Sequence, residues 1–194
     1  MQTYQLLAIV GSTRVGSSSH RLLDFIMAQP EQKTGACSWK LFDISTLPYF
    51  NQDLDSLLNA LDDKTLTEAG DALTQVKLFR EKIEKSDGVL IITPEYVFSL
   101  PGVLKNALEW LASTTLLAAK PMALITAAAS GVKAKTSLEL ITKTLGGDFT
   151  EHTSILIPGI AGKIKPDGTV ADPALNNLLK ELLLSWMELI DPTY

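Results

Sequence analysis

Short apolar runs separated by helical patterns are the feature that most restricts how this chain can fold. Four of these runs carry apolar residues at consecutive positions, which is typical of strands buried on both faces of a parallel sheet. A fifth, weaker strand is predicted around Trp39, Leu41 and Asp43, where apolar residues alternate with polar ones. The four strong runs are Leu6–Val10, Gly88–Thr93, Met122–Thr126 and Ser154–Ile157. Such strands require helices on both sides of the sheet.

Each predicted strand is followed by a segment suited to form a helix. Apolar residues three and four positions apart predict helices around Leu22–Ile26, over Ala69–Lys85 and near Thr136. We expect one further helix to begin at Pro101 and the last to open with Asp172-Pro173. This strict alternation predicts an α/β fold with a doubly wound parallel sheet. The longest stretch without such a pattern runs from residue 45 to residue 67 and is expected to be irregular.

Length and composition fit one domain over residues 1–194, without linker or repeat. The net charge of -5 argues against nucleic acid as a partner, because binding to a phosphate backbone needs a basic face. The single cysteine, Cys37, allows no intrachain disulfide and is expected to be a buried small side chain. His20 and His152 lack neighbouring ligands, so no metal site is predicted. We expect a cytoplasmic protein without membrane insertion, since neither a signal peptide nor a sufficiently long apolar run is present.

The loop after the first strand has the composition of an anion site. Residues 11–20 contain six Gly or Ser residues, and a helix follows directly. The N–H groups at the start of that helix favour an anion, and the Arg14 guanidinium suits a phosphate. Ser17 stands where a P-loop needs Lys, and no G-x-G-x-x-G pattern is present. The loop is therefore either a different kind of phosphate site or a plain polar turn with a helix cap.

The loop after the third strand, residues 93–102, is stiffened by Pro94, Pro101 and Gly102 and carries Tyr96 and Phe98. It could support a flat heterocycle or pack against another subunit. In a doubly wound sheet, both loops lie at the carboxyl ends of the strands, where ligands bind. A loop that binds phosphate and a neighbouring loop that supports a flat ring would together form a mononucleotide site.

These residues resemble the NADPH-dependent FMN reductases of the flavodoxin-like superfamily, which include quinone, azo-dye and chromate reductases. The resemblance is carried by Gly11-Ser12-Thr13-Arg14 with Ser17 and Ser19, by Thr93-Pro94-Glu95-Tyr96, and by the run from Ser99 to Trp110. Residues 43–53 also look like the family. The resemblance implies a flavodoxin-like five-stranded parallel sheet with strand order 2-1-3-4-5 and helices on both faces.

The resemblance also implies which residues bind FMN. Ser12, Arg14, Ser17 and Ser19 would hold its phosphate. Pro94, Glu95, Tyr96 and Val97 would line the isoalloxazine ring, and Ser130 and Gly131 would close its far side. The chain departs from the family at Val97, where Asn or another polar residue is usual, and at residues 132–135, where a Gly-Gly pair is usual. Lys133 and Lys135 could meet the phosphates of NADPH or form a solvated charged face.

The activity implied is an NAD(P)H-dependent oxidoreductase that works in two half-reactions. NADPH or NADH would deliver hydride to bound FMN, and a small electron acceptor such as a quinone, free flavin, azo dye or metal oxyanion would then be reduced. No catalytic side chain is assigned, because the chemistry belongs to the cofactor. The alternatives are a flavodoxin-type electron carrier and a non-enzymatic FMN-binding regulatory module. The resemblance further implies a homodimer or homotetramer.

Overall fold

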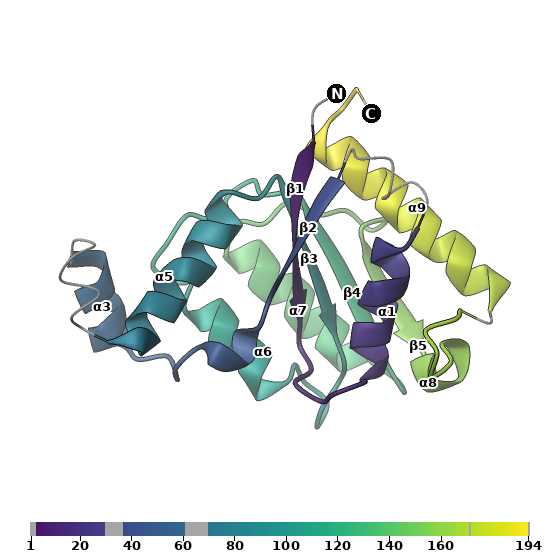
Figure 1. Cartoon of the computed structure of the whole chain (residues 1–194), viewed down its shortest axis with the longest axis horizontal. Helices are drawn as coiled ribbons and strands as arrows, with labels where there is room; N and C mark the ends of the chain where they lie inside the picture. The colour runs from purple at the N-terminus through teal and green to yellow at the C-terminus, as the bar shows by residue number, and fades with distance from the viewer. Residues whose placement is uncertain (1–2, 30–36, 61–69, 171, 194) are drawn as a thin grey trace.

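The computed structural model describes residues 3–29, 37–60, 70–170 and 172–193, which form one five-stranded parallel sheet between two layers of helices (Figure 1). The strand order is β2-β1-β3-β4-β5, so the predicted order 2-1-3-4-5 is confirmed. β2 lies on one side of β1 and β3, β4 and β5 lie on the other, so the topological switch point falls between β1 and β3. The strands are β1 (Tyr4–Val10), β2 (Cys37–Phe42), β3 (Gly88–Thr93), β4 (Met122–Ala128) and β5 (Ser154–Pro158).

Both faces of the sheet are apolar, which explains the consecutive apolar residues in the strands. In β1, Leu7 and Ile9 point into one core, whereas Leu6, Ala8 and Val10 point into the other. The first core is covered by α3 (Gln52–Ala60), α5 (Asp71–Glu84), α6 (Gly102–Glu109) and α7 (Val132–Thr144). The second is covered by α1 (Ser18–Met27), α8 (Ile160–Lys163) and α9 (Pro173–Ile190). The two cores fix the sheet between the helix layers.

The expectation of an irregular segment over residues 45–67 is wrong for its described part. A 3-10 turn, η1 (Ile44–Thr46), and the helix α3 lie there, while residues 61–67 fall outside the described residues. The side chain of Asn51 accepts hydrogen bonds from the N–H groups of Asp53 (2.8 Å) and Leu54 (3.3 Å), and so caps α3. Asp53 and Asp55 add negative charge to its first turn. Asn51, followed by these acidic residues, is the sequence pattern that indicates the start of α3.

Smaller differences concern where elements begin and end. Pro101 is the N-cap of α6, so that helix begins one residue later than predicted. The helix expected near Thr136 begins at Val132, directly after Gly131. Asp43 lies beyond β2 and caps η1 by accepting from the N–H of Ser45. Ala69, the predicted first residue of α5, lies outside the described residues.

The two ends of the described chain meet at the edge of the sheet opposite to the switch-point loops (Figure 1). There the Tyr4 hydroxyl donates a hydrogen bond to the carboxylate of Asp191, just after α9. Among the helices described, none is long and apolar enough to span a membrane. The loops that carry the candidate site lie at the opposite edge, where β1, β3 and β4 end.

Candidate functional site

The loop after β1 begins with a close contact to β3. Gly11 donates its N–H to the carbonyl oxygen of Ile92 at 2.8 Å. A Cβ atom at Gly11 would lie only 2.7 Å from the Thr93 hydroxyl oxygen and 3.0 Å from Leu104. Only glycine fits this approach without displacing a neighbour. Gly11 thereby holds the start of the loop against the end of β3, at the topological switch point.

The first turn of α1 presents polar groups without an acidic neighbour. Ser17 is the N-cap, and its hydroxyl accepts from the N–H of His20 at 3.2 Å. The N–H groups of Ser18 and Ser19 have no acceptor among the described residues. Ser12, Ser17 and Ser19 are all buried, and the first turn contains no acid. Free N–H groups, hydroxyls and the positive end of the helix dipole make this turn suited to an anion.

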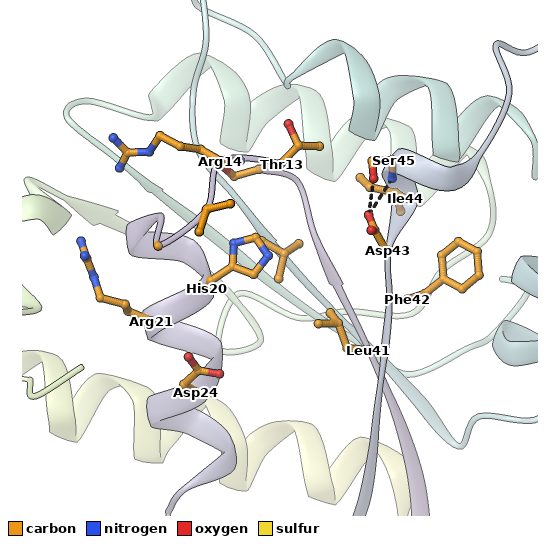
Figure 2. A pocket seen from close by; sticks show the side chains of 14 residues that line it. Thr13, Arg14, His20, Arg21, Asp24, Leu41, Phe42, Asp43, Ile44 and Ser45 are labelled. Atoms are coloured by element: carbon orange, nitrogen blue, oxygen red, sulfur yellow. Dashed lines mark hydrogen bonds between the residues drawn. The ribbon is translucent and has the colours of Figure 1, made fainter. Parts of the chain in front are cut away.

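Two arginines stand beside this turn. The Arg14 guanidinium makes no hydrogen bond or ion pair with any described residue, so its charge is available to a ligand. Arg21, which the sequence did not single out, donates to the Ser18 hydroxyl at 3.3 Å, and its buried Nε has no partner in the described chain. Figure 2 shows both guanidinium groups on the side of α1 away from β2. The periodicity of α1 did not indicate that Arg21 lies next to Arg14 at the first turn.

The loop after β3 contains a tight hairpin turn. Tyr96 and Ser99 exchange two backbone hydrogen bonds of 3.0 Å, and between them Val97 and Phe98 have φ angles of 52° and 57°. Two central residues with positive φ match a type I′ turn, which favours Asn-Gly. Val97 is 95% exposed and Phe98 78% exposed. The structure therefore places Val97 at the tip of the turn and not among the lining residues of the neighbouring hollow.

Glu95 joins this loop to the start of α7. Its carboxylate accepts hydrogen bonds from the N–H groups of Gly131 (3.1 Å), Lys133 (3.0 Å) and Ala134 (3.0 Å). The hydrogen bond from Ala134, those from Gly131 and Lys133, and the charge of Lys133 hold the pKa of the Glu95 carboxyl below its ordinary value. Glu95 is thus an ionised cap for a helix to which it does not belong.

The two loops face each other across a hollow of about 290 Å³. Of the ten predicted site residues, the structure brings seven to its lining, while Val97, Ser130 and Gly131 do not line it. Gly131 nevertheless touches the site through its hydrogen bond to Glu95. The seven are Ser12, Arg14, Ser17, Ser19, Pro94, Glu95 and Tyr96; Ser18, Ala127–Ala129 and Ile160 complete the lining.

The two lysines at the start of α7 differ in their surroundings. Lys135 forms an ion pair with Glu139 one turn further along the helix. Lys133 donates its backbone N–H to Glu95. Neither lysine lines the hollow between the loops. The arrangement fits a charged helix face better than a phosphate contact in this hollow.

Two further hollows adjoin the same edge. One, of about 410 Å³, lies between α1 and the end of β2, with the His20 ring turned toward β2 (Figure 2). The other, of about 650 Å³, lies between the start of α6 and the loop that contains Leu47–Tyr49. Asn106 holds this segment by donating to the Pro48 carbonyl (2.9 Å) and accepting from the Phe50 N–H (2.7 Å). Trp110 also donates to Pro48, at 2.9 Å. Asn106 and Trp110 therefore hold this loop against α6.

In the described part of the chain, no three His, Cys, Asp or Glu side chains are grouped so that they could bind a metal ion. Cys37 is half-buried rather than buried, and burial raises the pKa of its thiol. A raised thiol pKa disfavours the reactive thiolate. The candidate site thus consists of a polar loop suited to an anion, a loop with a tight hydrogen-bonded turn, and the hollow between them.

Comparison with solved structures supports the fold. A flavoenzyme NAD(P)H:(acceptor) oxidoreductase from Paracoccus denitrificans is 24% identical, covers 98% of both chains and superposes with a TM-score of 0.74. An azoreductase from Bacillus anthracis is 16% identical, covers 98% of this chain and 100% of its own, and gives a TM-score of 0.62. At these identities the likeness shows the fold alone.

Sequence comparison identifies the family. A 2-hydroxy-1,4-benzoquinone reductase from Burkholderia sp is 34% identical over 55% of this chain and 49% of its own length. The chain thus spans about half the length of this relative. A NAD(P)H:quinone oxidoreductase from Solanum tuberosum is 28% identical over 93% of this chain and 90% of its own. The family described as NADPH-dependent FMN reductase matches residues 4–154. The chain therefore belongs to the NADPH-dependent FMN reductase family.

Proposed function

We propose that this protein binds FMN at the switch-point edge of the sheet and is an NAD(P)H-dependent oxidoreductase that reduces small electron acceptors. The observation that carries the proposal is the hollow in which an anion cradle and a rigid loop face each other. This pairing suits a mononucleotide, which has an anionic end and a flat end. Family membership supports FMN as the mononucleotide.

The phosphate would be held by the loop after β1. The buried hydroxyls of Ser12, Ser17 and Ser19 and the free N–H groups of the first turn of α1 supply donors. Arg14 supplies a positive charge that no described residue neutralises, and Arg21 stands next to it. A guanidinium can donate two parallel hydrogen bonds to a phosphate. These groups fit a phosphate monoester better than a neutral ligand.

The isoalloxazine ring would lie against Pro94, Glu95 and Tyr96, facing residues 127–129 across the hollow. Proline and the hydrogen-bonded turn keep this wall rigid, so little entropy is lost when a flat ligand is bound. Gly131 takes part through the Glu95 carboxylate, and Ser130 adjoins it in the same loop. Val97, exposed at the tip of the turn, remains a proposed ring contact from outside the lining of the hollow.

Bound FMN supplies the hydride-transfer chemistry, whereas the protein binds, orients and tunes it. We propose a ping-pong sequence in which NADPH or NADH and the acceptor use the site in turn. The acceptor class is a quinone, free flavin, azo dye or metal oxyanion, and the quinone reductases among the relatives support the first of these. The reaction needs no acid–base pair from the chain.

We also propose that the protein works as a homodimer or homotetramer. Tyr49, Val97 and Phe98 expose apolar surface on loops close to the hollows, which is the kind of surface that subunits bury. The sole cysteine is compatible with the reducing cytoplasm, where we place the protein.

Binding is tested by titrating the purified apoprotein into FMN and following the quenching of flavin fluorescence. Wild-type protein should quench, and Arg14→Ala should weaken binding by about tenfold or more, since a charge-assisted hydrogen bond contributes about 1.5–3 kcal/mol. Lys85→Ala is the matched control, because it also removes one positive charge. Lys85 lies between α5 and the start of β3, at the end of the sheet opposite to the site. Absence of quenching by the wild type would overturn the proposal, and equal loss in both variants would remove Arg14 from the phosphate site.

A further inference from the structure

The start of α7 lacks a cap of its own. Its N-cap residue is Gly131, with φ of 92°, and no acidic residue lies in its first turn. Helix N-termini otherwise recruit a Ser, Thr, Asp or Asn to satisfy their free N–H groups. Here the carboxylate of Glu95, from the loop after β3, accepts from three of these N–H groups. The cap of α7 is therefore supplied by the loop after β3, which lines the hollow.

Gly131 also leaves little freedom for this junction. A Cβ atom at Gly131 would lie 2.6 Å from Leu156 and 3.1 Å from Thr126, so the loop is packed tightly against β4 and β5. Glu95 attaches the loop after β3 to this fixed point. The position of the loop after β3 relative to the start of α7 is thereby set by one side chain.

The same carboxylate is a charge at the site. Glu95 lines the hollow of about 290 Å³, and its hydrogen bonds keep it ionised at neutral pH. The positive end of the α7 dipole would otherwise face this region and favour negative charge. With Glu95 in place that end of α7 is neutralised, so it stabilises a nearby anion less than a bare helix terminus would.

We infer that Glu95 is a positioning residue that fixes the ring-binding loop after β3 against the start of α7, and that its negative charge makes bound FMN a stronger reductant. This inference rests on the proposed FMN binding. Reduction adds electrons to the flavin, and a neighbouring negative charge disfavours the more electron-rich form. The fixed carboxylate therefore weakens binding of reduced FMN relative to oxidised FMN, which lowers the reduction potential.

Two substitutions separate charge from position. Glu95→Gln removes the charge but keeps an acceptor oxygen of nearly the same shape, whereas Glu95→Ala removes both. Glu151→Gln is the matched control, because it makes the same chemical change at a side chain that is 89% exposed just before β5, away from the site. The readouts are the FMN reduction potential, the dissociation constant for oxidised FMN, and urea unfolding of the apoprotein.

Glu95→Gln should favour binding of reduced over oxidised FMN by about tenfold, a rise of about 30 mV for two electrons. It should change the dissociation constant of oxidised FMN less than Glu95→Ala does. Glu95→Ala should also destabilise the apoprotein, because the N–H groups of α7 lose their acceptor. Glu151→Gln should leave all three readouts unchanged.

The outcomes distinguish the inference from the function on which it rests. If wild-type protein binds FMN but Glu95→Gln leaves the potential equal to that of Glu151→Gln, the tuning role is wrong and the proposed function stands. If Glu95→Ala leaves FMN affinity and apoprotein stability unchanged, the positioning role is wrong. If the wild type binds no FMN, the proposed function itself fails, and the tuning role with it.

Discussion

Val97 is a β-branched residue in a left-handed backbone conformation, and its replacement should stabilise the protein. Its φ is 52°, and that of Phe98 is 57°. A non-glycine residue in this region costs about 1–2 kcal/mol. Because Val97 is 95% exposed, its side chain gives little packing in return. Asn tolerates this conformation, so Val97→Asn should raise the free energy of unfolding by about 1 kcal/mol.

The assay is urea unfolding of the apoprotein, with thermal melting as a second measure. A gain of about 1 kcal/mol corresponds to a rise in Tm of about 2–4 °C for a chain of this size. The double variant Val97→Asn/Phe98→Gly places the preferred Asn-Gly pair in the turn and should gain more. Val15→Asn is the control, since Val15 is 98% exposed and has no positive φ. If Val97→Asn is no more stable than Val15→Asn, the turn is not strained as argued.

Three other perturbations test separate parts of the fold. The hydrogen bond to Asp191, burial and the Asp191 charge raise the pKa of Tyr4 to about 12, so the stability of the wild type should fall more steeply between pH 10 and 12 than that of Tyr4→Phe. Equal pH dependence of the two free energies of unfolding, measured in urea, would contradict this. Gly11→Ala should cost about 1–3 kcal/mol and weaken FMN binding, because its Cβ would press on Thr93; an unchanged FMN titration would show that the loop has room. Arg80 pairs with Asp55, a buried carboxylate in α3. Arg80→Ala leaves Asp55 unpaired and should lower the free energy of unfolding by about 3–5 kcal/mol, whereas a loss below about 1 kcal/mol in urea unfolding would show that the pair is not needed.

The strands and the helix layers could be predicted because each strand carries its own signal, whereas the strand order followed only from the family resemblance. In β3, all six residues are buried, so consecutive apolar residues reported burial on both faces directly. The Gly-Ser loop before α1 was likewise visible as composition, and its residues do line the hollow beside the loop after β3. Local patterns were sufficient wherever burial or capping involves neighbours in sequence.

The parts that escaped prediction depend on contacts distant in sequence or on backbone conformation. Glu95 was expected to line the ring, but its capping of α7 joins residues 36 to 39 positions apart. The departure at Val97 was visible in the sequence, whereas its positive φ was not. Arg21 looked like an ordinary polar position of an amphipathic helix and became notable only beside Arg14. Such roles depend on contacts between segments that are distant in sequence, and the periodicity of a sequence does not predict those contacts.

The central claim is that this chain binds FMN and transfers electrons from NAD(P)H through it. The most direct measurement is the visible absorbance spectrum of the FMN-loaded protein before and after NADPH is added without oxygen. Rapid bleaching of the oxidised flavin, followed by recovery when a quinone is added, is the predicted result. A flavin that stays bound and oxidised would contradict the oxidoreductase function and favour an electron carrier or a regulatory FMN-binding module.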